Sequence, residues 1–138
     1  MSKQASCQER IEQEYAHTIE TVRLLWEAYC QGEEQGVEGL GEWTEYGLSF
    51  DYVASDEDNE HSYFQWCLST GGPGDEVRFY PNIYMTYPHI EYVFLDWFDG
   101  AEMEVSGADK QLLTDIWDNW FIEGGQVAAL GLEPVEVW

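Results

Sequence analysis

The fold is decided by the central stretch TEYGLSFDYVASDEDNEHSYFQWCLSTGGPGDEVRFYPNIYMTYPHIEYVFLDWF, residues 44–98, in which apolar and polar side chains alternate. Near its start, Leu48, Phe50 and Tyr52 are separated by the polar residues Ser49 and Asp51. An apolar residue at every second position is typical of a half-buried β-strand. The central stretch therefore predicts a β-sheet.

Two turns divide this stretch: the acidic SDEDNE at 55–60 and the glycine-rich GGPGD at 71–75, which has hairpin turn chemistry. Connections this short join antiparallel neighbours, because a parallel crossover needs a dozen or more residues. Pro81 and Asn82 interrupt the third strand and predict an edge or a bulge there. The expected strands cover 48–53, 61–70, 77–87 and 89–98.

A long amphipathic helix is predicted before the sheet. Between Ser6 and Gln31, apolar residues recur at steps of three and four, and most of the glutamates lie off this stripe. Gly32 is placed to end the helix, since glycine tolerates the left-handed conformation of a C-terminal cap. The glycine- and glutamate-rich residues 32–43 are expected to form a loop or a short frayed helix.

A second helix is predicted after the sheet. Ser106 is the expected N-cap, with Asp109 reaching back to complete a weak capping box. Gly124 and Gly125 are placed to end this helix. The expected fold class is α+β: an antiparallel four-stranded sheet flanked by an N-terminal and a C-terminal helix, in one acidic domain spanning 1–138.

The charge of the chain predicts a class of partner. Twenty-eight Asp and Glu face five Lys and Arg, giving a formal net charge of −23, and no base lies between Arg23 and Arg78. Such a field repels nucleic acid and anionic membranes and attracts basic surfaces. Proteins that bind polyanions carry such basic surfaces. We therefore expect a basic nucleic-acid-binding protein as partner, and neither direct nucleic-acid binding nor membrane association.

The aromatic content indicates that this acidic chain folds. Seven Trp, nine Tyr and six Phe accompany a hydrophobic fraction of 44%, whereas disordered acidic chains lack aromatic residues. So many large rings exceed what a core of this size comfortably hides. Some of them are expected at the surface, where Tyr and Trp favour interfaces.

The cysteines and the N-terminus predict an intracellular protein. Cys7, Cys30 and Cys67 are odd in number and lack the spacing of a metal or redox motif. Free thiols in a reducing cytoplasm are the expected state. The N-terminal residues have no apolar signal core, and no run of residues approaches the length of a membrane span.

No motif supports catalysis or a cofactor. His17, His61 and His89 do not follow a metal-ligand pattern. A calcium loop at 56–60 lacks the required glycine after Glu60. Pairs of carboxylates could serve a glycosidase, but a chain with this many acids contains such pairs by chance. The sequence therefore predicts a non-enzymatic protein without a metal or cofactor.

Two acidic segments are the candidate docking surfaces. Acids four apart on a helix lie about 6 Å apart along its axis, and acids two apart on one strand face about 6.6 Å apart. Carboxylates at such spacings can occupy positions that a nucleic-acid channel provides for phosphates. The candidate acids are Glu33, Glu34, Glu38, Glu42, Glu45, Asp56, Glu57, Asp58, Glu60, Asp96, Asp99, Glu102 and Glu104, and the candidate aromatic anchors are Trp43, Tyr46, Tyr63 and Trp97.

Three segments carry a resemblance: EYGLSFDYVA at 45–54, GGPGDEVRFY at 71–80 and IEYVFLDWFDGA at 90–101. Together they resemble an uncharacterised family of small acidic proteins carried by bacterial mobile elements, among them phages and plasmids. The resemblance covers about two-fifths of the chain and brings no catalytic residues. It implies a setting in which small acidic proteins inhibit DNA-targeting machinery, as anti-restriction and anti-CRISPR proteins do.

The leading hypothesis is a nucleic-acid mimic that docks on the basic groove of a nuclease, CRISPR effector or restriction enzyme. The alternative is an interaction module, such as an immunity or antitoxin protein, that binds through exposed aromatic residues. A third interpretation is an acidic proteome, as in halophiles, where every surface has this charge. The sequence leaves open whether the chain forms a homodimer.

Overall fold

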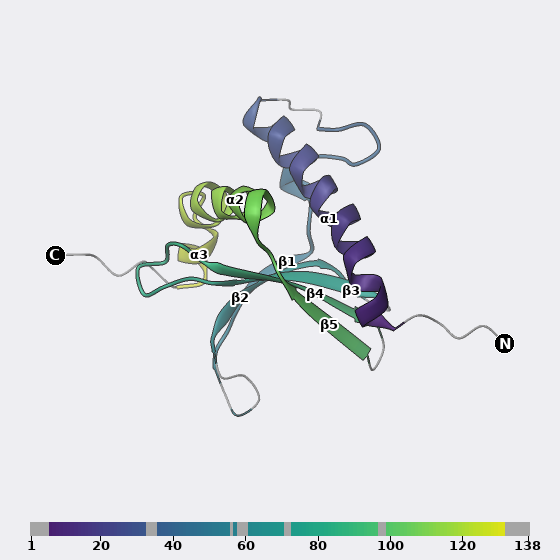
Figure 1. Cartoon of the computed structure of the whole chain (residues 1–138). Helices are drawn as coiled ribbons and strands as arrows, with labels where there is room; N and C mark the ends of the chain where they lie inside the picture. The colour runs from purple at the N-terminus through teal and green to yellow at the C-terminus, as the bar shows by residue number, and fades with distance from the viewer. Residues whose placement is uncertain are drawn as a thin grey trace.

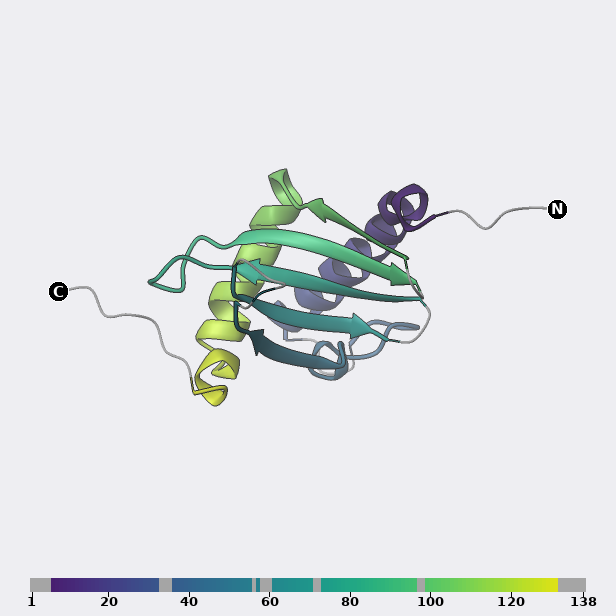
Figure 2. The same ribbon diagram turned by 90° about the horizontal axis from the view of Figure 1, so that it is seen from below.

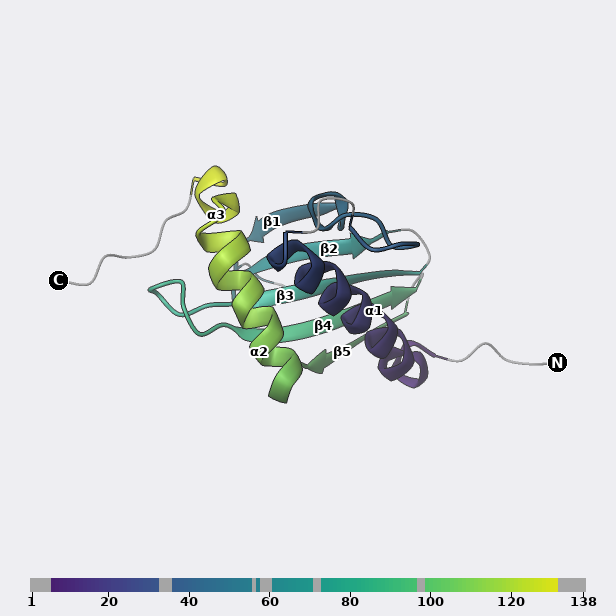
Figure 3. The same cartoon turned by 90° about the horizontal axis from the view of Figure 1, so that it is seen from above.

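The computed structural model describes residues 6–32, 36–55, 57, 61–70, 73–96 and 99–131. Five antiparallel strands form one sheet in which each strand pairs with its neighbours in sequence. The helices pack on one face of this sheet (Figures 1 and 3), and none of the described helices lies over the opposite face, which is seen in Figure 2. The elements are α1 (Cys7–Cys30), η1 (Trp43–Glu45), β1 (Ser49–Val53), β2 (Tyr63–Ser69), β3 (Gly74–Tyr80), β4 (His89–Asp96), β5 (Asp99–Glu104), α2 (Gly107–Ile116), η2 (Trp117–Ile122) and α3 (Gln126–Ala129).

Helix α1 confirms the prediction made from the first periodic segment. The Ser6 hydroxyl accepts a hydrogen bond from the Glu9 backbone N–H, which caps the N-terminus. The helix ends at Cys30 with Gln31 as its C-cap, and Gly32 follows with φ +78°, the left-handed region that glycine tolerates. The buried stripe of α1, which includes Ile11, Val22 and Trp26, packs on the sheet and its connections. None of the described helices has the length and apolar character needed to cross a bilayer.

The prediction of four strands is wrong, because β5 adds a fifth. In β5 only Ala101 and Met103 provide the apolar alternation, and they pair with Phe94 and Tyr92 of β4. The rest of the strand is acidic or glycine, residue types that are depleted in strands. Pairing with β4 therefore forms this strand against its own weak propensity.

The third strand lies earlier in the sequence than expected. It was predicted over 77–87, but β3 begins at Gly74 and ends at Tyr80. Asp75 belongs to the strand because its carboxylate faces the core and accepts hydrogen bonds there from α1 and β4. The segment 81–88 is a loop between β3 and β4 that extends beyond the end of the sheet (Figures 1 and 2).

A cluster of stacked rings forms the core between the sheet and the C-terminal helices. Trp117 of η2 is fully buried and lies 5.1 Å, centroid to centroid, from Phe79 of β3. Phe121, one turn later, lies 4.2 Å from Phe50 of β1. Helix α1 covers the other half of the same sheet face, over β4 and β5 (Figure 3).

The start of the second helix is confirmed, but its predicted capping box is not. Ser106 occupies the N-cap position without making a side-chain capping bond. Asp109 instead accepts hydrogen bonds from the Tyr15 hydroxyl at 2.7 Å and from Arg23 at 2.7 Å, so it binds α2 to α1. Gly125 adopts φ +89° and separates η2 from the short α3.

Candidate functional site

The arginines of the described chain all form ion pairs with carboxylates of the same molecule. Arg10 pairs with the buried carboxylate of Asp96 at the end of β4. Arg23 pairs with Asp109 at 2.7 Å, and Arg78 pairs with Glu76 at 2.7 Å. Arg23 also reaches Glu20 of its own helix. These guanidinium groups therefore hold the elements together.

The outward face of α1 carries a row of exposed acids. Both of its arginines contact carboxylates of other elements, Asp96 and Asp109. Acids spaced along the helix are exposed and lie on the face away from the sheet. From the first to the last of them the helix rises about 27 Å, at about 1.5 Å per residue. These acids are Glu9, Glu12, Glu20 and Glu27, named here the α1 acidic face.

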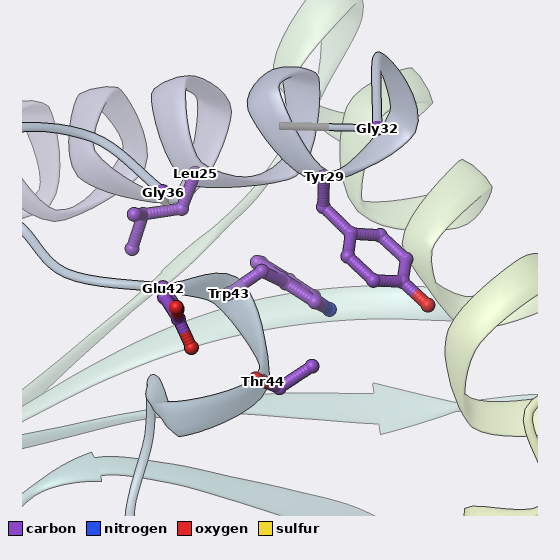
Figure 4. Close-up of a pocket in the computed structure, with 7 residues that line it drawn as sticks. All are labelled: Leu25, Tyr29, Gly32, Gly36, Glu42, Trp43 and Thr44. Atoms are coloured by element: carbon purple, nitrogen blue, oxygen red, sulfur yellow. The ribbon is translucent and has the colours of Figure 1, made fainter. Parts of the chain in front are cut away.

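The loop after α1 brings several of the predicted residues together. Glu38 and Glu45 are exposed, and Glu42 is half-buried at the mouth of a cavity of about 330 Å³. Figure 4 shows Leu25 and Tyr29 pointing from α1 toward the segment that carries Glu42, Trp43 and Thr44. The α1 acidic face is thus followed, after the C-terminal end of the helix, by three more acids, of which Glu42 lines the cavity beside Tyr29 and Trp43.

Trp43 is buried, so its prediction as an exposed anchor is wrong. Its ring is 4% exposed and lies 4.9 Å from the ring of Trp26 and 5.6 Å from that of Trp66. Within the described chain its Nε1 is buried and has no hydrogen-bond partner among nitrogen and oxygen atoms. The surrounding rings offer only π faces, which are weak acceptors. Trp43 fixes the loop to the core rather than presenting itself to a partner.

The two other described aromatic candidates are also enclosed to different degrees. Tyr63 is 6% exposed, although it lies on the sheet face without helices, because the Arg78 guanidinium stacks over its ring at 4.6 Å. Its prediction as an exposed anchor is wrong for that reason. Tyr46 is half-buried against Trp43 and Trp66. Burial, together with the charge of Asp75, raises the pKa of Tyr46 to about 12.

Asp96 and Asp99 lie at the N-terminus of α1. The backbone N–H of Cys7 donates to an Asp99 oxygen at 2.7 Å, and this bond lowers the pKa of Asp99 below its ordinary value. Asp96 is 9% exposed and pairs with Arg10. Carboxylates are favourable at this end of a helix, where free N–H groups and the helix dipole carry positive charge. The prediction of Asp96 as a docking residue is wrong, because its carboxylate is buried and paired with Arg10.

The remaining predicted acids among the described residues are Glu57, Glu102 and Glu104. Glu102 and Glu104 are exposed on β5, on the same face of the sheet, and Glu104 lies opposite Glu91 of β4. His89 contacts both of these carboxylates, at 3.1 Å from Glu91 and 3.9 Å from Glu104. Glu57, in the β1–β2 connection, is exposed.

The structure therefore separates the predicted acids into two groups. Glu38, Glu42 and Glu45 accompany α1, whereas Glu102 and Glu104 lie across the sheet from it. Six predicted residues lie outside the described residues: Glu33, Glu34, Asp56, Asp58, Glu60 and Trp97.

Sequence reasoning missed the α1 acidic face as a site. The spacing of its glutamates is visible in the sequence. The ion pairs that Arg10 and Arg23 form with Asp96 and Asp109 are not. Each of these pairs joins residues 86 apart in the sequence. A helical projection with both arginines placed at the edge of the apolar stripe is the signal that could have suggested it.

No known protein family, curated protein or solved structure matches this chain. Across the described ranges, no group of three or more His, Cys, Asp and Glu side chains is arranged to hold a metal ion. The candidate site is accordingly defined by geometry and charge: the α1 acidic face and its continuation by Glu38, Glu42 and Glu45.

Proposed function

We propose that this chain is a non-enzymatic inhibitor that mimics nucleic acid. It docks through the α1 acidic face on the basic groove of a DNA-targeting protein. The target is of the kind that anti-restriction and anti-CRISPR proteins inhibit, a restriction enzyme or a CRISPR effector. The proposal includes a cytoplasmic location in a bacterial cell and a gene carried by a mobile element.

The observation that carries the proposal is the internal use of the arginines. Arg10 and Arg23 arise from α1 itself, yet they reach Asp96 and Asp109. Arg23 also pairs with Glu20 at 2.6 Å, whereas the exposed Glu9, Glu12 and Glu27 form no ion pair among the described residues. Unbalanced charge of this kind destabilises a compact chain through self-repulsion. The acidic surface retains this destabilising charge, while the arginines of the same helix pair with carboxylates of other elements. Such a surface is suited to binding the Lys and Arg side chains of a partner.

The length of the surface suits a groove for nucleic acid. The 27 Å rise of the acidic face is about the axial length of eight base pairs, at 3.4 Å per step. Rows of carboxylates would steer the encounter with a basic groove and set the register. They would also displace the phosphates that the groove otherwise binds, which explains inhibition by occupancy.

The proposal is tested by comparing two charge-matched variants as baits in a nuclease-treated bacterial lysate. The first replaces Glu9, Glu12, Glu20 and Glu27 with Gln. The second replaces Asp51, Glu57, Glu102 and Glu104 with Asn or Gln, away from α1. Each removes four carboxylates and takes the formal net charge from −23 to −19. Captured proteins are eluted with stepwise NaCl and challenged with duplex DNA.

The wild-type chain should retain nucleic-acid-binding proteins that elute stepwise with salt and are displaced by duplex DNA. The α1 variant should lose them, and the variant away from α1 should keep them. Equal loss from both variants would show that net charge matters and that the face does not. Retention of the same proteins by the α1 variant would contradict the proposal.

The second candidate function is an interaction module of the immunity or antitoxin type. It is favoured by exposed aromatic side chains, among them Tyr29, Tyr84 and Tyr87. In that case the acids mainly steer association, so salt changes the association rate more than the dissociation rate. Kinetics at graded salt with a captured protein separate the two functions.

A further inference from the structure

The β3–β4 loop presents a group of apolar side chains to solvent. Ile83 is 69% exposed, Tyr84 is 41% exposed and Tyr87 is 85% exposed, all within five residues. The loop projects beyond the end of the sheet (Figures 1 and 2). Scattered apolar residues on a surface need no explanation, but a projecting group of large ones marks an interaction site.

A network centred on Asn82 fixes the shape of this loop. The Asn82 side-chain oxygen accepts from the Tyr84 backbone N–H at 2.9 Å, and from the N–H and hydroxyl of Thr86 at 3.1 Å each. The Asn82 backbone also exchanges hydrogen bonds with its loop, donating to the Thr86 carbonyl and accepting from the Met85 N–H. Pro81 and Pro88 restrict the backbone at both ends.

Contacts between Met85 and the core hold the loop in place. The indole N–H of the fully buried Trp117 donates to the Met85 carbonyl at 2.8 Å, and the Met85 side chain packs against the core. Met85 and Tyr87 adopt φ of +61° and +48°, a region that costs energy for residues with a side chain. Strain at an exposed Tyr persists only where the surrounding structure imposes it, and such strain gathers at functional sites.

The charge of the loop differs from that of the rest of the chain. No Asp or Glu occurs between Glu76 and Glu91, in a chain of net charge −23. Acids lie close behind the loop: Glu91 and Glu104 face each other near the same end of the sheet. A cavity of about 560 Å³, lined by His61, Tyr80, His89 and Glu91 among others, lies at the base of the loop.

We propose that the tip of the β3–β4 loop, Ile83, Tyr84 and Tyr87, is a preformed plug that inserts into an apolar cleft with a basic rim on a partner protein. The inference rests on the proposed function in one respect, because it takes this partner to be the protein that the acidic face engages. Rigid aromatic and aliphatic anchors of this kind dominate the affinity of protein interfaces. A loop held in shape before binding also loses little entropy when it binds.

The apolar tip and its acidic surroundings together favour a protein cleft with a basic rim over a lipid surface or a second copy of the chain. A lipid surface would accept the tip, but the net charge of −23 opposes approach to the anionic headgroups of membranes. A second copy of the chain would bring two highly acidic molecules together, which like charge opposes. An apolar cleft bordered by Lys and Arg is complementary both to the tip and to the carboxylate of Glu91 at the base of the loop.

Paired substitutions separate a binding role from a structural one. Tyr87→Asn and Ile83→Asn remove exposed side chains, and Asn tolerates the positive φ at position 87. We expect the urea midpoint to stay the same or rise in Tyr87→Asn. Affinity for the protein captured by the wild-type chain should fall at least tenfold in each variant. Leu48→Asn, which removes a 60% exposed apolar side chain near the opposite end of the sheet, is the matched control and should keep full affinity.

Site-specific cross-linking then identifies what the tip contacts. A photoreactive benzoylphenylalanine is placed at position 87, at position 20 on the α1 acidic face, or at position 48, and each full-length protein is irradiated in the nuclease-treated lysate. The proposal expects cross-links from 87 and from 20 to one nucleic-acid-binding protein, with the peptide joined to 87 mapping to an apolar cleft.

The outcomes distinguish the two proposals. A cross-link from 87 to a protein that does not bind nucleic acid supports the plug and contradicts the proposed function. Cross-links from 20 without any from 87 support the proposed function and overturn the plug. Cross-linking of 87 to lipid or to a second copy of the chain also overturns it, as does unchanged affinity in Tyr87→Asn and Ile83→Asn.

Discussion

Asp75 is a buried carboxylate that the described chain satisfies with hydroxyl groups rather than with a base. It accepts from Tyr92 at 2.7 Å, from Thr18 at 2.9 Å and from Ser69 at 2.6 Å, and so joins α1, β2 and β4. Burial raises the pKa of Tyr92, and Asp75 raises it further, so this phenol remains a donor at neutral pH. A buried charge is tolerated when hydrogen bonds satisfy it.

Tyr92→Phe should therefore destabilise the protein by about 2 kcal/mol, the usual contribution of a hydrogen bond to a charged group. The free energy of unfolding in urea measures this loss. Tyr87→Phe is the matched control, since an exposed phenol should change that free energy by less than about 0.5 kcal/mol. Equal effects of the two substitutions would contradict the role assigned to Asp75.

Asp99 should contribute pH-dependent stability at the N-terminus of α1. Its pKa is lowered by the Cys7 backbone N–H, so its contribution is fully present above the ordinary carboxyl pKa of about 3.9 and is lost as the pH falls through the lower folded value. Asp99→Asn should be less stable than wild type at pH 5–7, with the difference shrinking below about pH 4. A difference in urea midpoint that stays constant down to about pH 2 would exclude this mechanism.

At the scale of elements, the β3–β4 loop owes its shape to one amide. Asn82→Ala removes the oxygen that accepts from Tyr84 and Thr86. The backbone N–H groups of these two residues should then exchange with solvent much faster, and stability should fall by about 1–2 kcal/mol. Amide hydrogen exchange measured by NMR tests this expectation. Asn119→Ala on η2 should leave both amides protected, and slow exchange in Asn82→Ala would contradict the account.

The elements that local sequence specifies were predictable, and those that tertiary contacts impose were not. Helix α1 follows from apolar periodicity and from a capping serine. The loop 81–88 reads as strand, because Ile83, Tyr84 and Tyr87 favour strands. The Asn82 network holds the loop instead, together with the hydrogen bond from Trp117 to Met85, which joins residues 32 apart in the sequence. Strand β5 likewise depends on β4 rather than on its own residues.

The same reasoning explains the mixed result for the candidate site. Acidic composition shows that carboxylates are abundant, but it does not show which of them bind arginine. Asp96 is taken by Arg10, and Tyr63 lies under Arg78. Both contacts join different elements, so they could not be read from neighbours in the sequence.

At the scale of the whole molecule, self-repulsion should limit stability. Added salt screens charges over about 10 Å at 0.1 M, so the urea midpoint should rise between about 0.05 and 0.5 M NaCl. The variant with Gln at positions 9, 12, 20 and 27 should gain less stability from added salt. A midpoint that falls with salt would contradict this view. Folding only at molar salt would instead support the halophile interpretation.

The most direct test of the central claim is competition between this chain and duplex DNA for one captured DNA-targeting protein. The association constant is measured from about 50 to 200 mM NaCl, the range over which phosphate-like contacts lose most affinity. The account predicts mutually exclusive binding and a steep fall of affinity with salt, which becomes shallower when the α1 acidic face is neutralised. Simultaneous binding of chain and DNA, with affinity independent of salt, would contradict it.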